Sequence, residues 1–143
     1  TMPFDLSTKK ILLADDSAIM RMILSLHLRR FTGASITAVE NGRDALVKLT
    51  QERFDLLLTD INMPEMNGIE LVRHLRGGLK SELPIIIITT RGEVRDRDLG
   101  MSLGANGYLT KPVNVKDLIM TVLGQLGDRT YGRPPAPPPA LGA

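Results

Sequence analysis

LLLTDINMPEMNG occupies residues 56–68 and joins an apolar run to a carboxylate, Asp60, and then to a turn. The run at 56–58 does not alternate with polar residues, which is typical of a strand buried on both faces. Four further short apolar runs lie at residues 11–14, 35–39, 85–88 and 108–109. The sequence therefore predicts five strands.

Longer amphipathic segments lie between these runs and predict helices over 17–31, 42–52, 67–77, 93–103 and 115–126. The first helix is expected to carry one apolar face, made of Ile19, Met20, Ile23, Leu24 and Leu28. Strands that alternate with helices over short connections imply parallel pairing through right-handed crossovers. The predicted fold is a three-layer α/β sandwich around a parallel five-stranded sheet, and this pattern leaves the strand order open.

The composition fits one domain, because 43% of the 143 residues are hydrophobic and 24% are charged. The 18 basic and 16 acidic residues are interspersed, so the net charge of +2 does not indicate a surface for nucleic acid.

The absence of cysteine excludes disulfides and thiolate metal sites. No apolar run approaches the roughly 20 residues of a membrane span, and residues 1–10 lack the apolar stretch of a signal peptide. We therefore expect a cytoplasmic protein with no nucleic-acid or membrane partner.

The composition changes once, near Gly127. Residues 128–143 carry five of the nine prolines and few side chains suited to a core. We predict a disordered N-terminal lead at 1–8, a folded domain at 9–127 and a Pro-rich tail or linker at 128–143.

Polar side chains follow four of the predicted strands, at the sheet edge where parallel α/β folds bind ligands. They are Asp15 and Asp16, then Asp60, then Thr89 and Thr90, and finally Thr110 and Lys111. Each of these residues taken alone is better explained as a solvated loop residue or a helix cap. Their shared position after strands favours a common site.

Three neighbouring carboxylates repel one another and need a hard cation to stay ionised together. The chain has no cysteine, and His27 and His74 lie inside predicted helices, so oxygen ligands remain and Mg²⁺ or Mn²⁺ is expected. A lysine and a threonine hydroxyl facing the metal would complete a cradle for a tetrahedral dianion. The implied chemistry is phosphoryl transfer with an aspartate as nucleophile.

Four motifs, ILLADDS, LLLTDINMPEMNG, IIIITT and GYLTKP, occur in this order within residues 10–126. In sequence and spacing they resemble the receiver domain of bacterial two-component response regulators, most closely the chemotaxis-type single-domain form. The resemblance implies a flavodoxin-like (βα)5 fold with strand order 2-1-3-4-5. It also implies a signalling switch rather than an enzyme with a separate substrate.

The resemblance further implies that Asp60 accepts a phosphoryl group from a phosphohistidine on a sensor histidine kinase or phosphotransfer protein. The metal ligands would be Asp15, Asp16, Asp60 and the backbone carbonyl of Asn62. Lys111 would pair with the phosphoryl group, and the bond from Lys111 to Pro112 would be cis.

A switch is also implied by the resemblance. Thr89 would be the switch hydroxyl, and Tyr108 would be the aromatic residue that changes rotamer when Thr89 moves inward. Access to the phosphoryl group is expected to depend on Asn62, Thr90 and Arg91, and Thr90 is bulkier than the residue usual at its position in the family.

The predicted helix at 93–103 is the weakest in the chain, because its first turns are nearly all charged and Gly100 interrupts it at a cost of about 1 kcal/mol. We expect phosphorylation to reorder the face formed by this helix, the strand at 107–110 and the helix at 115–126. A partner protein or a second copy of the chain would bind there.

Three of these features also have simpler explanations. The segment 63–68 could be a turn in which Asn67-Gly68 supplies left-handed backbone geometry. Tyr108 could be an ordinary edge aromatic. The charged start of the helix at 93–103 could be a solvated face on which Glu93 pairs with Arg97.

A haloacid-dehalogenase-type phosphatase is the alternative from another class, because it also places a nucleophilic aspartate beside Mg²⁺ at a strand end. Such enzymes use a second acid two positions after the nucleophile, where this chain has Asn62. They also need a cap, for which 143 residues leave no space. No GxxxxGK[ST] or GxGxxG motif is present to indicate a nucleotide-binding fold.

Overall fold

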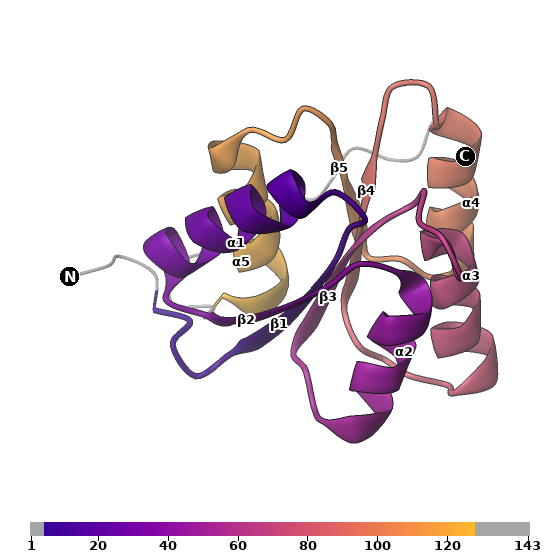
Figure 1. Ribbon diagram of the computed structural model, residues 1–143, viewed down its shortest axis with the longest axis horizontal. Coiled ribbons are helices and arrows are strands. Elements are labelled where there is room, and N and C mark those ends of the chain that lie inside the picture. The colour runs from indigo at the N-terminus through magenta and orange to yellow at the C-terminus, as the bar shows by residue number, and fades with distance from the viewer. Residues whose placement is uncertain (1–4, 128–143) are drawn as a thin grey trace.

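The computed structural model describes residues 5–127, which form a five-stranded sheet between two layers of helices (Figure 1). The strands are β1 (Lys10–Ala14), β2 (Ser35–Val39), β3 (Leu56–Asp60), β4 (Ile85–Thr89) and β5 (Gly107–Thr110). All neighbours pair in parallel, in the order β2-β1-β3-β4-β5. The predicted flavodoxin-like fold and its strand order are confirmed.

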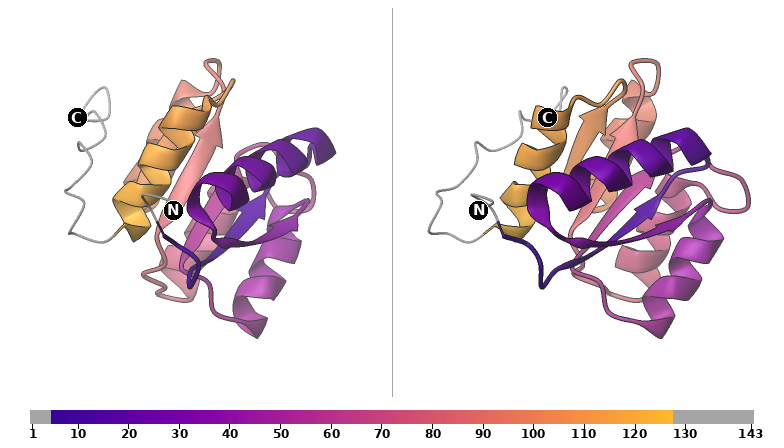
Figure 2. Two further views of the ribbon diagram at one scale, coloured as in Figure 1. Left: turned by 90° about the vertical axis from the view of Figure 1, so that its left-hand side faces the viewer. Right: turned by 60° about the vertical axis from the view of Figure 1, so that its left-hand side comes forward.

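Helices cover both faces of the sheet. They are α1 (Ala18–Thr32), α2 (Gly42–Gln51), α3 (Gly68–Arg73), α4 (Val94–Leu103) and α5 (Val115–Leu126). Figure 2 shows α1 and α5 together on one face, and α2, α3 and α4 lie on the other. Leu13 and Ile86 point into the first layer, whereas Leu12 and Ile87 point into the second. The central strands do not alternate in polarity because both of their faces are buried.

The apolar face expected on α1 is wrong in part. Leu24 and Leu28 are buried and Met20 packs against them, but Ile19 is 64% exposed and Ile23 is 39% exposed. Residues 20, 24 and 28 follow an i, i+4, i+8 spacing that gives one narrow buried stripe. Ile19 and Ile23 belong to a second apolar stripe that faces solvent.

The helix expected at 67–77 is divided. It begins as α3 and continues as a short π-helix, η1 (His74–Gly78), in which the amide of Leu79 donates to the carbonyl of His74 at 2.9 Å. The side chain of Arg76 holds this wider turn, because it donates to the carbonyls of Gly104 and Ser81. One of these acceptors, Gly104, lies 28 residues away in the sequence, so this end of the helix is tied to the end of α4.

The described residues, 5–127, contain the whole of the folded domain expected at 9–127. Within the expected lead at 1–8, Leu6 is buried in the core and its amide donates to the carbonyl of Thr32 at 2.8 Å. The folded part therefore begins before the expected boundary at residue 9. Residues 1–4 and the Pro-rich segment at 128–143 lie outside the described residues. Between residues 5 and 127, no helix is long and apolar enough to span a membrane.

Candidate functional site

The strand registers place the sequence-predicted site residues in one row. Ala14 of β1 pairs with Thr59 of β3, so Asp15 and Asp60, the next residues on each strand, come side by side. In the same way Asp60 pairs with Ile88, which Thr89 follows. Thr89 pairs with Thr110, which Lys111 follows. The parallel sheet therefore gathers residues from four strand ends at its carboxyl edge.

The three acidic residues form one cluster. Each of Asp15, Asp16 and Asp60 offers a carboxylate oxygen, and these oxygens lie within 4.8 Å of one another. Asp15 and Asp60 are buried, whereas Asp16 is exposed. One side of the cluster therefore opens to solvent.

One oxygen of the cluster lacks a hydrogen bond. Oδ1 of Asp15 accepts the amide of Ser17 at 2.9 Å, but its buried Oδ2 has no hydrogen-bond partner among the described residues. The nearest cation is Nζ of Lys111, at 3.5 Å. A buried carboxylate oxygen without a donor is costly in a folded protein. A divalent cation bound by the cluster would satisfy it, so the residues present fit a hard metal ion.

Lys111 links the two buried carboxylates. Its Nζ also donates to Oδ2 of Asp60 at 3.2 Å, and its amide donates to the carbonyl of Thr89 at 2.6 Å. The peptide bond to Pro112 is cis, as the resemblance implied. Burial lowers the pKa of Lys111, but the negative charges of Asp60 and Asp15 outweigh this effect and raise its pKa above the ordinary value. The ammonium group is therefore charged at neutral pH.

Asp60 is tuned by the same neighbours. Burial raises the pKa of its carboxyl from 3.8 to about 6, with a further contribution from the charge of Asp15. Lys111 and the amide of Ile61, which donates to Oδ1 of Asp60 at 2.9 Å, act in the opposite direction. The carboxylate is therefore mostly ionised at neutral pH, and Lys111 and the Ile61 amide offset only part of the cost of burying its charge.

The loop after β3 is shaped by its contact with Asp60. A β-carbon on Gly68 would lie 2.2 Å from the carbonyl oxygen of Asp60, so only glycine fits there. The left-handed residue is Glu65, with φ 67°, rather than Asn67-Gly68 as the simpler explanation required. Asn67 instead starts α3, because it forms a capping box with Glu70.

Thr89 is the last residue of β4, and Tyr108 is the second residue of the neighbouring strand β5. The Thr89 hydroxyl is buried and donates to the carbonyl of Leu109 at 3.4 Å. Tyr108 is half-buried, and the guanidinium of Arg97 from α4 lies 4.7 Å from its ring centroid. Tyr108 is therefore covered by a residue of α4 in this state.

Glu93, which the sequence analysis assigned to a solvated face, links the loops that follow β3 and β4. Glu93 accepts the amide of Thr90 at 2.6 Å, and it also accepts the side-chain amide of Asn62. The expected Glu93–Arg97 pair is not formed, since Arg97 contacts Asp98 at 3.2 Å instead. The Thr90-x-x-Glu93 spacing is that of a capping box and could have indicated the first bond, but no local signal indicates the second.

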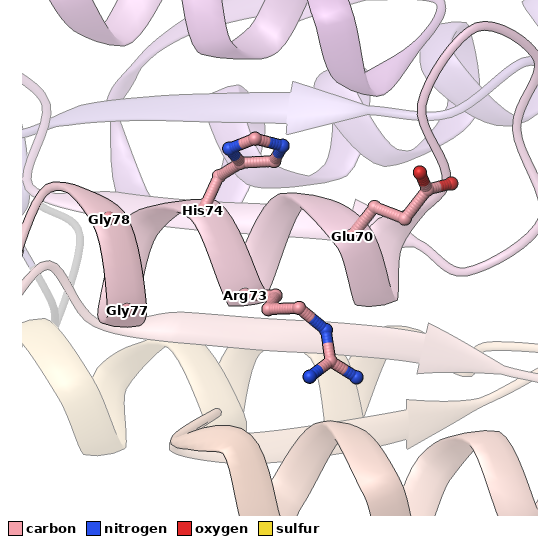
Figure 3. Close-up of a pocket in the computed structure, with 5 residues that line it drawn as sticks. All are labelled: Glu70, Arg73, His74, Gly77 and Gly78. Carbon is pink, nitrogen blue, oxygen red and sulfur yellow. The ribbon is translucent and has the colours of Figure 1, made fainter.

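An open hollow lies elsewhere, on α3 and η1. Its lining consists of Glu70, Arg73, His74, Gly77 and Gly78. Figure 3 shows Glu70 and His74 extending from one side of the helix and Arg73 from the other, so their polar groups do not converge. None of the predicted site residues lines it.

The chain is similar to proteins of known type over nearly its whole described length. The model of the response regulator receiver domain matches residues 11–123. The chemotaxis protein CheY homolog of Campylobacter jejuni is 39% identical over 120 residues, which cover 80% of this chain and 92% of that protein.

Solved structures of response regulators and receiver domains have the same fold as this chain. Chemotaxis response regulator CheY4 of Vibrio cholerae is 35% identical, with a TM-score of 0.73 over 80% of this chain and 95% of that one. The receiver domain of Ssk1 from Saccharomyces cerevisiae, solved with the histidine phosphotransfer protein Ypd1, is 25% identical, with a TM-score of 0.75 over 82% of this chain and 88% of that chain.

Other curated relatives are longer. The chain spans 46% and 48% of two transcriptional regulatory proteins and 10% of a sensor protein. The chain therefore belongs to the response regulator receiver domain family of two-component signalling.

Proposed function

We propose that this receiver domain accepts a phosphoryl group on Asp60 from a phosphohistidine on a sensor histidine kinase or phosphotransfer protein. The observation that carries the proposal is the shared contact of Lys111, whose ammonium lies 3.2 Å from Asp60 and 3.5 Å from Asp15 within the acidic cluster. This arrangement pairs a nucleophile with a positive charge at the place where a phosphoryl group would arrive.

In the proposed reaction a carboxylate oxygen of Asp60 attacks phosphorus. The phosphorus–nitrogen bond breaks, the imidazole leaves with a proton, and an acyl phosphate forms on Asp60. The attacking oxygen must be ionised, and a pKa of about 6 leaves most of the carboxyl ionised at pH 7 and above. Lys111 would stay beside the phosphoryl oxygens and offset their charge.

Mg²⁺ or Mn²⁺ belongs to the proposal as a cofactor. Its ligands would be Asp15, Asp16, Asp60 and the backbone carbonyl of Asn62. The cation would supply positive charge to the phosphoryl oxygens when bound. The orphaned Oδ2 of Asp15 is the observation that supports this assignment.

The exposed stripe of α1 supports a protein as the phosphoryl donor. It consists of Ile19, Met22, Ile23 and Leu26. These residues follow i, i+3, i+4, i+7 spacing, so they form one apolar face, and α1 begins three residues after Asp15. We propose that this stripe packs against the donor while its phosphohistidine reaches Asp60.

We further propose that phosphorylation draws the Thr89 hydroxyl away from Leu109 and onto the phosphoryl group. Tyr108 would then change rotamer, and the face of α4, β5 and α5 would reorder to bind an output protein or a second copy of the chain. Gly100 is the one buried residue of α4, and Met101 and Leu103 are only partly buried, which supports a helix held by few core contacts. Access of water to the acyl phosphate would depend on Asn62, Thr90 and Arg91.

The phosphatase alternative gains no support from the family match or from the position of Asn62. A cytoplasmic location remains part of the proposal, and the absence of cysteine agrees with a reducing compartment.

The proposal is tested by mixing the chain with acetyl phosphate and Mg²⁺ and measuring phosphoryl incorporation by intact mass. We expect incorporation in the wild type, none in Asp60→Asn, and none in the wild type with excess chelator. Asp96→Asn removes an exposed carboxylate of α4 and should behave as the wild type. Incorporation that survives Asp60→Asn or the chelator would refute the proposal.

A further inference from the structure

Glu93 holds together two loops at the mouth of the site. One carboxylate oxygen accepts the amide of Thr90 at 2.6 Å, and the other accepts the side-chain amide of Asn62. We infer that this Glu93 bridge occupies hydrogen-bond donors that a phosphoryl group on Asp60 needs, so that Glu93 competes with the phosphoryl group in the resting protein. The inference rests on the proposed function and adds a regulatory residue to it.

Both bridged residues flank the phosphoryl acceptor. Asn62 follows Asp60 by two residues, and Thr90 follows Thr89, which stands next to the strand partner of Asp60. A phosphoryl group on Asp60 would present three oxygens carrying about two negative charges, and such oxygens are stabilised by N–H donors. The bridge already engages two nearby donors, and the Thr89 hydroxyl is engaged by Leu109. The donors that already contact Asp60 are the ammonium group of Lys111 and the amide of Ile61.

A helix cap alone does not explain the bridge. The bond from Thr90 spans three residues, as in half of a capping box, and Glu93 in turn donates its amide to the carbonyl of Thr90 at 3.1 Å. The bond from Asn62 spans 31 residues and comes from the loop after β3. A cap would need the first bond only, whereas both together connect the loops that follow β3 and β4.

The negative charge of Glu93 also opposes a phosphoryl group on Asp60. A carboxylate at the mouth repels an incoming phosphoryl dianion, and a phosphoryl group that takes over the two donors must displace it. Loss of the bridge should therefore favour the phosphorylated form. A competing hydrogen bond of about 1 kcal/mol corresponds to ~5-fold in binding. Part of that gain should remain in Glu93→Gln, which loses the charge and keeps an acceptor.

The first measurement needs neither metal nor phosphoryl donor. Amide exchange of Thr90, followed by NMR, should be slower in the wild type than in Glu93→Ala, because the mutation removes the acceptor of that amide. Asp96→Ala removes another carboxylate near the start of α4, one with no hydrogen bond to either loop, and should leave Thr90 unchanged.

The second measurement uses beryllofluoride with Mg²⁺, in which the fluorides stand in for phosphoryl oxygens. We expect its affinity to rise ~5-fold in Glu93→Ala, by less in Glu93→Gln, and not at all in Asp96→Ala. Faster exchange of the Thr90 amide in Glu93→Ala than in the wild type, together with this order of affinities, supports the inference.

If Glu93→Ala binds beryllofluoride with wild-type affinity, the Glu93 bridge is only structural. If Asp96→Ala raises the affinity by the same factor, the effect is one of general charge. Either result would overturn the inference but not the proposed function. A wild-type protein that binds no beryllofluoride would overturn the proposed function together with it.

Discussion

Gly68 packs so closely against Asp60 that a β-carbon at Gly68 would lie 2.2 Å from the Asp60 carbonyl oxygen. The amide of Gly68 also donates to the carbonyl of Ile61 at 2.8 Å, so the loop after β3 folds back onto the end of its own strand. This contact fixes the backbone that follows the acceptor carboxylate.

Gly68→Ala should therefore destabilise the domain. The new methyl group meets backbone atoms that cannot yield, and we expect a loss of about 2 kcal/mol or more in the free energy of unfolding. Urea denaturation gives the value. Gly77→Ala is the matched control, because a β-carbon at Gly77 meets nothing within 4 Å. Equal losses in both variants would contradict the role of the close contact.

The raised pKa of Asp60 predicts a pH-dependent stability. Between pH 3.8 and about 6 the folded protein keeps the Asp60 proton that the unfolded chain releases, so stability falls as pH rises through this window. Above pH 6 the cost of the buried charge is fully present. Asp60→Asn removes that cost and should be more stable than the wild type by about 1–2 kcal/mol at pH 8.

The two proteins should converge below about pH 3, where the Asp60 carboxyl is mostly protonated in both states. Urea denaturation at both pH values measures the difference, and Asp96→Asn controls for an exposed carboxylate. A constant difference between wild type and Asp60→Asn across this range would show that the carboxyl has an ordinary pKa.

If the exposed stripe on α1 is a docking surface, a mutation in it should slow phosphorylation by a protein phosphodonor but not by a small-molecule phosphodonor. Met22→Glu places a charge on the stripe and should slow phosphoryl transfer at least about tenfold from a histidine phosphotransfer protein that phosphorylates the wild type. Phosphorylation by acetyl phosphate should not change, because that donor needs no docking surface. Val47→Glu, at an exposed position of α2, is the control for an added charge. If Met22→Glu slows both donors equally, α1 is not the docking surface.

The output face predicts changed hydrogen exchange. With beryllofluoride and Mg²⁺, amides at residues 90–110 should change their protection, since Thr89 would leave Leu109 and Tyr108 would leave its contact with Arg97. Amides of α2 should not change. Arg97→Ala removes the cation over the half-buried Tyr108 ring, a contact worth about 0.5–2 kcal/mol. Protection at residues 90–110 in the resting protein should therefore shift part of the way toward that of the beryllofluoride-bound form. Equal protection of residues 90–110 in both states would reject the switch.

Much of this architecture could be predicted from the sequence because its signals are local. Leu56–Leu58 shows no polar alternation, and Asp60 follows at the edge where parallel strands end. The strand order came from resemblance, since the crossover pattern fits several orders. The face of α1 could not be assigned, because Ile23 and Leu24 are equally apolar and only the packing against the sheet separates them.

The Glu93 bridge was missed for a related reason. Its partner Asn62 lies 31 residues away, and i, i+4 spacing offered Arg97 as a nearer candidate. Within the π-helical turn at His74–Gly78, Arg76 likewise donates to the carbonyl of Gly104, 28 residues away, and no local propensity indicates this bond.

The central claim is that Asp60 carries the phosphoryl group, and chemical trapping tests it most directly. After reaction with acetyl phosphate and Mg²⁺, borohydride reduces an acyl phosphate on aspartate to homoserine, which peptide mass spectrometry locates. We predict homoserine at position 60, and none when the phosphodonor or Mg²⁺ is left out. Homoserine at position 15 or 16 with position 60 unmodified would contradict the account.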